Sequence, residues 1–233
     1  MNDPANEFDS FDEITSIDQA EAAALASFKG DILSLNGLTS LSEEPARTLA
    51  SFRRTYLCLN GLKDISDDTA KALASFSGDR LCLNGLTSLS EEAAKALASF
   101  KGNLLALNGL TSLSEEAAKA LASFKGEHHL SLGGLRSLSE DGAKALASFK
   151  GDTLSLDGLT SLSEEAAKAL VSFKGECLSL MGLTSFTDGA AKALASFKGE
   201  YLFFNPRTNL SEVAAKALAS FKASMEAADA EPD

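Results

Sequence analysis

Hydrophobic residues recur along this chain at a nearly constant spacing. Leucine and phenylalanine positions each repeat every 24 residues, with one interval of 25. The leucine set is Leu33, Leu57, Leu81, Leu105, Leu130, Leu154, Leu178 and Leu202, and the phenylalanine set is Phe52, Phe76, Phe100, Phe124, Phe149, Phe173, Phe197 and Phe221. Because one unit of this length cannot bury its own apolar face, such a period is typical of stacked supersecondary units. The pattern therefore predicts a solenoid.

The first half of each unit predicts a strand and a turn. In one unit, Leu105 and Leu107 alternate with Ala106, which is the pattern of a short strand with one buried face. The pair Asn108-Gly109 follows. We expect it to end the strand, because glycine accepts a positive φ angle and asparagine tolerates one.

The second half of the unit predicts a helix. Ser114 stands at the N-cap position, where its hydroxyl can accept from the open amides of the first turn. Glu115 lies at the positive end of the helix dipole and four residues before Lys119, which is the favourable order for an ion pair. Phe124 is expected to fill the space near the helix end, and Gly126 to return the chain to the next strand.

The repeat divides the chain into three parts. Residues 31–222 hold eight units of about 24 residues, and the sequence before them matches the second half of a unit. Residues 1–30 are therefore predicted to form an N-terminal capping half-repeat, to which Phe8 and Phe11 would contribute. Residues 223–233 are predicted to form an acidic C-terminal tail.

Stacking of these units predicts the fold class. Successive strands would form a parallel sheet, and the helices would all lie on one side of it. Such an arrangement curves, with the strands on the concave face and the helices on the convex face. We therefore expect an α/β solenoid.

The recurring phrase LxLxxLxxLSxxxxxxLASF resembles the leucine-rich-repeat family over about residues 14–222. It is most similar to the cysteine-containing subtype, here with Leu89 to Glu91 at the helix start and Leu97-Ala98 inside the helix, and to bacterial proteins with near-identical tandem units. The family's Asn or Cys after the strand is a leucine here, so its ladder of buried side chains is missing. An Asn-Gly turn or a water could replace that ladder. The resemblance implies a protein-binding scaffold without catalytic residues.

Charge narrows the range of partners. The chain has 21 basic and 33 acidic residues, for a formal net charge of −12. Proteins that bind nucleic acids or anionic membranes use clustered Lys and Arg side chains to do so. We therefore expect neither a nucleic acid nor a membrane as a partner. The start, MNDPANEFDSFDE, has no features of a secretory signal, and three cysteines make no disulfide framework. We expect a cytoplasmic protein, with a removed leader and a secreted protein as open alternatives.

Residues that carry chemistry are few and scattered. His128 and His129 are adjacent and would point to opposite sides of a strand, whereas metal-binding pairs on helices are three or four residues apart. Cys58 and Cys82 occupy equivalent positions on neighbouring strands, where small apolar filler is favoured over a metal or redox site. No set of nucleophile, base and orienting residue is visible, and no phosphate-binding glycine loop. We predict no enzyme activity, no metal site and no cofactor.

At two positions of the repeat, both expected on the concave face, the residue type is nearly the same from unit to unit. We call each set of equivalent residues a column. The position between the two strand leucines is small in seven units, which predicts a shallow furrow. Small residues there either allow tight curvature, the favoured interpretation, or form a trough for a partner. The position after the second leucine is asparagine in the first four units. A repeated Asn-Gly turn explains this better than a stacked amide ladder, which is the alternative.

The position before the first leucine is the most variable column of the repeat. It reads Ile32, Tyr56, Arg80, Leu104, His129, Thr153, Cys177 and Tyr201. Variety in a chain that otherwise copies itself indicates drift or recognition, and large residues such as Tyr and Arg supply much of the binding energy in interfaces. The candidate partner-binding residues are Tyr56, Arg80, Leu104, His129 and Tyr201.

Three functions follow from these observations. The leading hypothesis is a non-enzymatic scaffold that binds a protein partner of unknown identity on its concave strand face. The alternative is a self-assembling structural protein that forms a homodimer through its last strand, where Tyr201, Phe203 and Phe204 lie at an edge without a following unit. A third hypothesis is a bacterial effector that acts on host proteins through its repeats.

Overall fold

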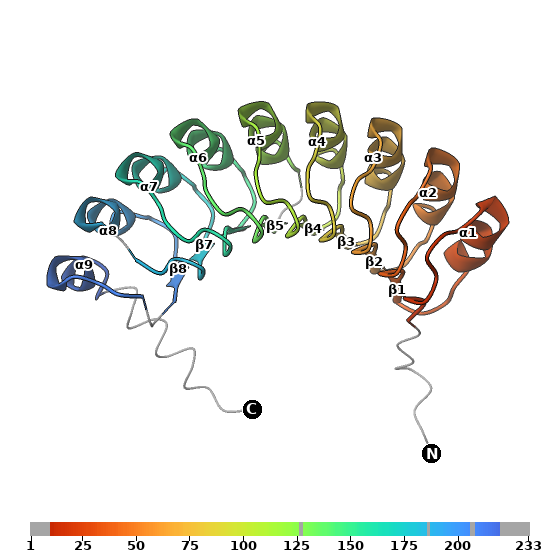
Figure 1. Ribbon diagram of the computed structural model, residues 1–233, viewed down its shortest axis with the longest axis horizontal. Coiled ribbons are helices and arrows are strands. Elements are labelled where there is room, and N and C mark those ends of the chain that lie inside the picture. The colour runs from red at the N-terminus through yellow and green to blue at the C-terminus, as the bar shows by residue number, and fades with distance from the viewer. Residues whose placement is uncertain (1–9, 126–127, 186, 206–207, 220–233) are drawn as a thin grey trace, which may run out of the picture.

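The computed structural model describes residues 10–125, 128–185, 187–205 and 208–219. Within these ranges, eight strands alternate with nine helices along an arc (Figure 1). The strands lie along the inner edge of the arc and the helices along its outer edge, as predicted. No helix in the described ranges is long and apolar enough to cross a membrane.

The strands form one parallel sheet in sequence order. They are β1 (Ile32–Ser34), β2 (Tyr56–Cys58), β3 (Arg80–Cys82), β4 (Leu104–Ala106), β5 (His129–Ser131), β6 (Thr153–Ser155), β7 (Cys177–Leu180) and β8 (Tyr201–Phe204). Neighbouring strands pair at equivalent positions of the repeat, so that Leu57 lies beside both Leu33 and Leu81. Each position of the repeat therefore forms a straight column across the sheet.

The helices begin as the sequence predicts. They are α1 (Gln19–Ala26), α2 (Glu43–Leu49), α3 (Asp67–Ala74), α4 (Glu91–Leu97), α5 (Glu115–Ala122), α6 (Glu140–Leu146), α7 (Glu164–Leu170), α8 (Asp188–Leu194) and α9 (Glu212–Ala217). At α5, the Ser114 hydroxyl accepts a hydrogen bond from the Ala117 amide at 3.1 Å. Glu115 forms the expected ion pair with Lys119. Local sequence chemistry therefore positions each helix.

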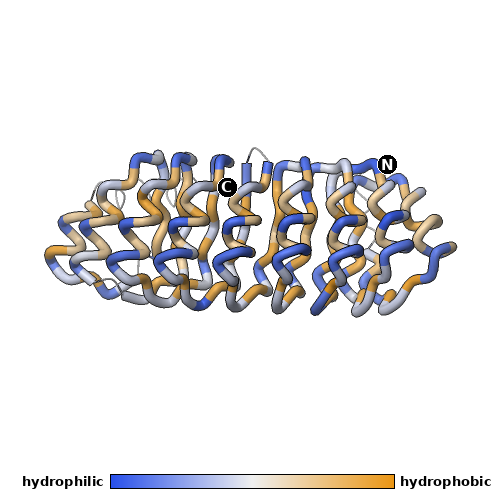
Figure 2. The backbone as a smooth tube through the Cα atoms, turned by 90° about the horizontal axis from the view of Figure 1, so that it is seen from above, coloured by the Kyte–Doolittle hydropathy of each residue, from blue (hydrophilic) through white to orange (hydrophobic). Residues whose placement is uncertain are grey.

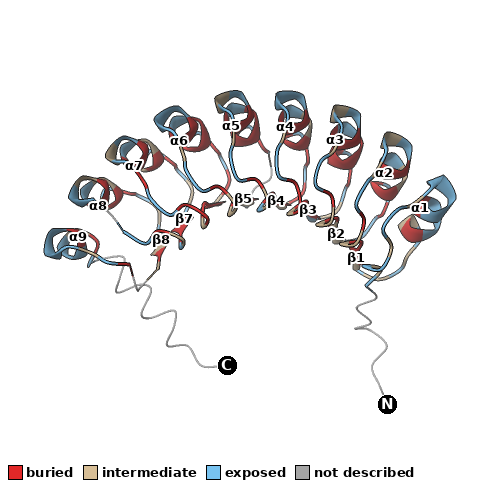
Figure 3. Ribbon diagram, in the orientation of Figure 1, coloured by how far each residue is buried: buried red, intermediate tan, exposed pale blue. Residues whose placement is uncertain are grey.

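The core consists of the leucine and phenylalanine columns. Seven phenylalanines from Phe52 to Phe197 stack with ring centroids 6.0 to 6.3 Å apart and interplanar angles of 5 to 8°. The inner faces of the helices are buried against the sheet, and the outer faces are exposed (Figure 3). The same alternation of hydrophobic and hydrophilic segments repeats from unit to unit (Figure 2). Each buried side chain thus packs against copies of itself.

The N-terminal end carries more of the repeat than its second half. Ser10 forms a parallel bridge with Ser34, and the Phe11 amide donates to the Ser34 carbonyl at 3.0 Å. The Phe11 ring packs edge-on against Phe28, with centroids 5.3 Å apart. A short extended segment therefore covers the free edge of β1. The other phenylalanine predicted for this cap, Phe8, lies outside the described residues.

The two ends of the arc differ in their helix surfaces. Glu21 of α1 is exposed at the repeat position where the inner helix α4 buries Ala93. Ala215 of α9 has the same residue type as Ala94 of α4, yet it is exposed where Ala94 is buried. The first helix thus presents a polar end surface, whereas α9 presents an ordinary stacking surface. The predicted acidic tail lies within residues 220–233, which are outside the described part of the chain.

The glycine after each Asn is explained by a close approach, and the prediction of a positive φ angle was wrong. No glycine in the described ranges has a positive φ. A Cβ atom on Gly109 would lie 2.3 Å from the carbonyl oxygen of Asn84 and 2.5 Å from that of Leu86. The turn of one unit therefore rests directly on the backbone of the preceding unit, and only glycine leaves room for it.

Candidate binding surface on the concave face

The variable column lies on the concave face, with one residue on each strand. Sheet register places Tyr56 beside Arg80, Arg80 beside Leu104, and Leu104 beside His129. Four of the five candidate residues therefore form a continuous row across β2 to β5, which we call the concave row. Tyr201 lies on β8, and β6 and β7 separate it from the concave row.

The most exposed member of the concave row is Arg80. Its Cζ atom lies 4.6 Å from the centroid of the Tyr56 ring, which is a cation–π contact. Within the described residues, no salt bridge joins Arg80 to an acidic side chain. The guanidinium is therefore held by the ring, and its hydrogen-bond donors remain open to a carboxylate on a partner.

His129 closes the concave row at β5. Its side chain is half-buried, and its Nε2 atom is buried without a hydrogen-bond partner in the described part of the chain. Burial lowers the pKa of His129; the charge of Asp157 raises it, and that of Arg80 lowers it. The neutral imidazole is therefore favoured. Leu104, the neighbour of His129 in the row, is also half-buried, so this end of the row is less polar than the Arg80 end.

The furrow column of small residues offers few free hydrogen-bond donors. Ser131 donates to Asn108 Oδ1 at 2.7 Å, and Ser34 donates to Asp12 Oδ1 at 2.7 Å. In the second half, the Ser155 hydroxyl donates to Asp157 Oδ2 at 2.7 Å. The serines of this column thus support the rim of the concave face, and the furrow itself is shallow.

Two cysteines replace serine in the furrow column of β2 and β3. Cys58 and Cys82 are direct register partners, and each is half-buried. A hydrogen bond from the Cys58 thiol to the Cys82 sulfur raises the pKa of Cys58 and lowers that of Cys82. The third cysteine, Cys177, lies between Thr153 and Tyr201 in the sheet register. It therefore has no thiol neighbour on either adjacent strand.

The asparagines form a ladder, but it joins each side chain to the backbone of the next unit rather than one side-chain amide to another. Each asparagine accepts a hydrogen bond through Oδ1 from the backbone amide of its equivalent in the next unit. The N···O distances are 3.1 Å from Asn60 to Asn36, 2.9 Å from Asn84 to Asn60 and 3.0 Å from Asn108 to Asn84. Asp12 begins the series by accepting from the Asn36 amide at 2.7 Å. This ladder of side chains on the concave rim satisfies the turn amides.

The ladder is interrupted in the second half of the arc. Asn108 Oδ1 still accepts from the Gly133 amide at 2.7 Å, but Gly133 has no side chain with which to continue the series. Asp157 resumes it by accepting from the Met181 amide at 2.9 Å, and the Met181 side chain again lacks an oxygen. The sequence signal for the ladder was the 24-residue spacing of these polar residues, which did not by itself reveal the contact.

The last strand presents two of its three aromatic residues. The rings of Tyr201 and Phe203 stack with centroids 5.9 Å apart, and Tyr201 is 40% exposed. Phe204 is only 2% exposed, because it takes the place of the second strand leucine, Leu180 in the preceding unit. Phe204 is therefore part of the core, and the accessible edge aromatics are Tyr201 and Phe203.

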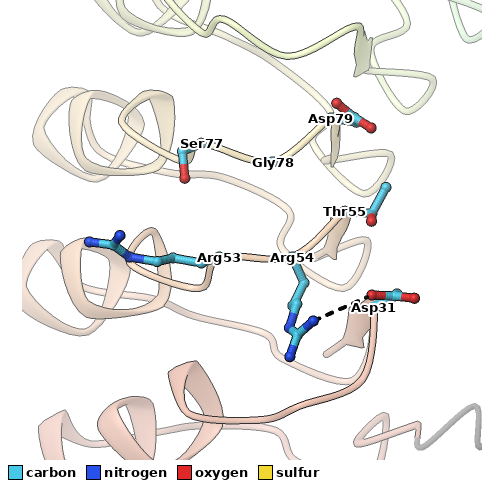
Figure 4. Close-up of a pocket in the computed structure, with 7 residues that line it drawn as sticks. All are labelled: Asp31, Arg53, Arg54, Thr55, Ser77, Gly78 and Asp79. Atoms are coloured by element: carbon cyan, nitrogen blue, oxygen red, sulfur yellow. Dashed lines mark ion pairs between the residues drawn. The ribbon is translucent and has the colours of Figure 1, made fainter.

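A shallow depression lies on the side of the arc where the strands begin (Figure 4). Its volume is about 280 Å³, and its lining includes Arg53, Arg54, Asp31 and Asp79. Arg53 points away from Arg54, and the Arg54 guanidinium lies 4.0 Å from an Asp31 carboxylate oxygen. The two arginines therefore do not converge on a common ligand position.

No group of three or more His, Cys, Asp or Glu side chains in the described ranges could hold a metal ion. His128 Nδ1 lies 2.8 Å from Asp152 Oδ2 on an exposed part of the surface. The two histidines were predicted to point to opposite sides of the strand. His128 makes this surface contact, and His129 belongs to the concave row.

Similarity to known proteins is found in structure and not in sequence. No family model matches the chain, and no curated protein matches its sequence. A chain of the Toll–Spätzle complex of Drosophila is similar in structure, with a TM-score of 0.52 and 13% identity over 77% of this chain and 24% of that one. An internalin from Listeria monocytogenes is similar with a TM-score of 0.51 and 17% identity, over 88% of this chain and 62% of that one.

These similarities and the strand order define the class. The chain has an α/β solenoid fold of the leucine-rich-repeat type, with eight parallel strands alternating with helices. The resemblance seen in the sequence is thus confirmed for the fold, while the cysteine-containing subtype remains a prediction. The chain spans 24% of the length of the similar chain from the Toll–Spätzle complex and 62% of the length of the internalin.

Proposed function

We propose that this protein is a non-enzymatic scaffold that binds a protein partner on its concave face through the concave row. The observation that carries the proposal is the continuity of Tyr56, Arg80, Leu104 and His129 across four adjacent strands. These side chains differ in chemistry, whereas the leucines beneath them are uniform. A partner would meet a cation, an aromatic ring and apolar surface in one patch, which is the composition of many interface hot spots.

The partner is expected to place an acidic group against Arg80. The Tyr56 ring holds the guanidinium at 4.6 Å and leaves its donors open, so a carboxylate can be bound in the bidentate manner. Apolar partner residues would then cover Leu104 and the half-buried side of His129. Tyr201 would contribute only to a partner long enough to cross β6 and β7.

A paired set of triple variants tests this proposal. Tyr56→Ala, Arg80→Ala and Leu104→Ala together should abolish capture of partners from a lysate of the source organism. The matched control replaces three convex lysines, Lys95, Lys119 and Lys144, with alanine and should capture the same proteins as the unchanged chain. Thermal unfolding, measured by circular dichroism, should change little in either set. Capture that survives the concave triple variant would show that the site is elsewhere.

The open end of the sheet supports a second candidate function, homodimerisation through β8. The exposed large hydrophobic residues in the described ranges are Met181, Tyr201 and Val213, and all belong to the last two repeats. Ala215 of α9 adds an exposed stacking surface beside them. A twofold dimer would bury these residues and close the sheet edge.

Light scattering during size-exclusion chromatography tests the dimer. We expect twice the chain mass at high concentration and the monomer mass for Phe203→Glu, which places a charge beside Tyr201. Ser112→Glu, in the exposed loop before α5 and far from β8, is the control and should keep the dimer mass. A monomer of the unchanged chain at high concentration would reject this function.

A further inference from the structure

The pair of cysteines in the furrow column, Cys58 and Cys82, has no part in the proposed partner-binding surface. Cys58 and Cys82 are register partners on adjacent parallel strands. Each alternates with fully buried leucines, so both side chains lie on the concave face. Both thiols are free and half-buried, which leaves them accessible from the concave side. The sheet thus presents two thiols side by side on a rigid element.

The ligand set limits what the pair can bind. Thiolate sulfur is a soft ligand that selects Cu(I), zinc and iron–sulfur clusters among biological metals. Zinc and iron–sulfur clusters require four protein ligands or nearly so. In the described ranges, no third His, Cys, Asp or Glu joins these two thiols. The nearby amide oxygens of Asn36 and Asn60 are used by the ladder.

We propose that Cys58 and Cys82 form a two-thiolate site for a single Cu(I) ion on the concave face. Binding breaks two S–H bonds and forms two Cu–S bonds, and both protons pass to solvent. Copper stays Cu(I), and no electron is transferred. The resulting bis-thiolate complex carries one negative charge. Arg80, two residues before Cys82 on the same face, supplies an opposite charge next to it.

The chain contains its own control for this site. Cys177 occupies the neighbouring column, and its register partners are Thr153 and Tyr201, so it lacks a second thiol. Serine is the ordinary residue of the furrow column, at Ser34, Ser131 and other strands. A Cys→Ser change at either cysteine therefore installs a residue that this fold already accommodates, and the variants should fold.

Anaerobic titration of the reduced 233-residue chain with Cu(I), using bicinchoninate as a coloured competitor, tests the proposal. The unchanged chain and Cys177→Ser should each bind one Cu(I) per chain. Cys58→Ser and Cys82→Ser should each bind it at least about 100-fold more weakly, because loss of a direct ligand exceeds the cost of losing a supporting contact. X-ray absorption of the loaded chain should show two sulfur neighbours around copper.

Three results would overturn the site. The unchanged chain could fail to compete with bicinchoninate, Cys177→Ser could lose the ion, or Cys58→Ser could bind as tightly as the unchanged chain. Circular dichroism of each variant shows whether its fold is intact. The measurement uses copper alone, so it stands or falls independently of the protein partner proposed for the concave row.

Discussion

The two halves of the arc share one core and differ in the polar row on the concave rim. From Asp12 to Gly133, each turn amide is bound by the side chain of the preceding unit. Beyond Gly133, the hydrogen bond from the Met181 amide to the Asp157 side chain repeats this pattern within the described residues. The phenylalanine stack nevertheless runs without change through both halves. The apolar columns are therefore common to both halves, and we expect the ladder to add a smaller stabilisation to them.

The largest expected effect tests whether the core is indeed the same in both halves. Phe100→Ala in the first half and Phe173→Ala in the second should each lower the free energy of unfolding by about 3 to 5 kcal/mol, because each removes a fully buried ring from between two others. Guanidinium unfolding followed by circular dichroism measures both. Phe28→Ala, at the half-buried end of the column, should cost less. A clearly unequal loss at Phe100 and Phe173 would contradict a common core.

A smaller effect separates the two kinds of glycine in the turns. Gly109→Ala places a Cβ atom against two backbone carbonyl oxygens, which cannot move without shifting the preceding unit, and should destabilise by about 3 kcal/mol. At Gly133, the closest atom is Asn108 Oδ1 at 2.9 Å, on a side chain that can adjust. Gly133→Ala should therefore cost less than about 1 kcal/mol.

Urea unfolding with fitted m-values distinguishes these two variants. Equal destabilisation at Gly109 and Gly133 would mean that the close approach to the carbonyls does not decide the residue type. The Gly109 variant should also unfold with an unchanged m-value, since the same surface is exposed on unfolding. A lower m-value would instead point to a native state that has lost some of its units.

Local features of the repeat were predictable, and contacts between repeats were not. The period fixed the strand columns, and the cap at Ser114 and the Glu115–Lys119 pair follow from chemistry within one helix. The ladder and the reason for Gly109 depend on how closely one turn approaches the next. That distance is a property of the stack and is not encoded in a single unit.

For the candidate binding surface, the positions of the residues were predictable from the sequence, and their side-chain contacts were not. Placement of the concave row follows from the register, which the constant period sets. The ring contact of Arg80 with Tyr56 and the unpaired Nε2 of His129 depend on side-chain conformations that the sequence does not specify. Phe204 shows the reverse case: the interval of 24 residues from Leu180 already assigned it to the core, although its aromatic neighbours suggested an edge.

Breaking and repairing the ladder should have opposite effects. Asn60→Ala removes the acceptor for the Asn84 amide and should destabilise by about 1 kcal/mol. Gly133→Asn places an acceptor one period before Asp157 and removes the flexibility of a glycine from the unfolded chain, so we expect a gain of about 0.5 kcal/mol. Thermal unfolding of both variants and of the double variant measures the two changes. A loss of stability in Gly133→Asn would show that the second half cannot accept the ladder.

The smallest effect concerns His129, which lies on β5 where the ladder stops. Burial lowers its pKa below the ordinary value of 6.5, so the folded chain binds this proton less readily than the unfolded chain. The stability that the neutral imidazole gives to the folded state is therefore fully present above pH 6.5. It is lost as the pH falls through the lower pKa of the folded state. His129→Leu should flatten the dependence of the unfolding free energy on pH just below 6.5, whereas His128→Ala should keep it. An unchanged pH dependence in His129→Leu would mean that the imidazole is hydrated, and that the half-buried end of the concave row is more open to water than its packing indicates.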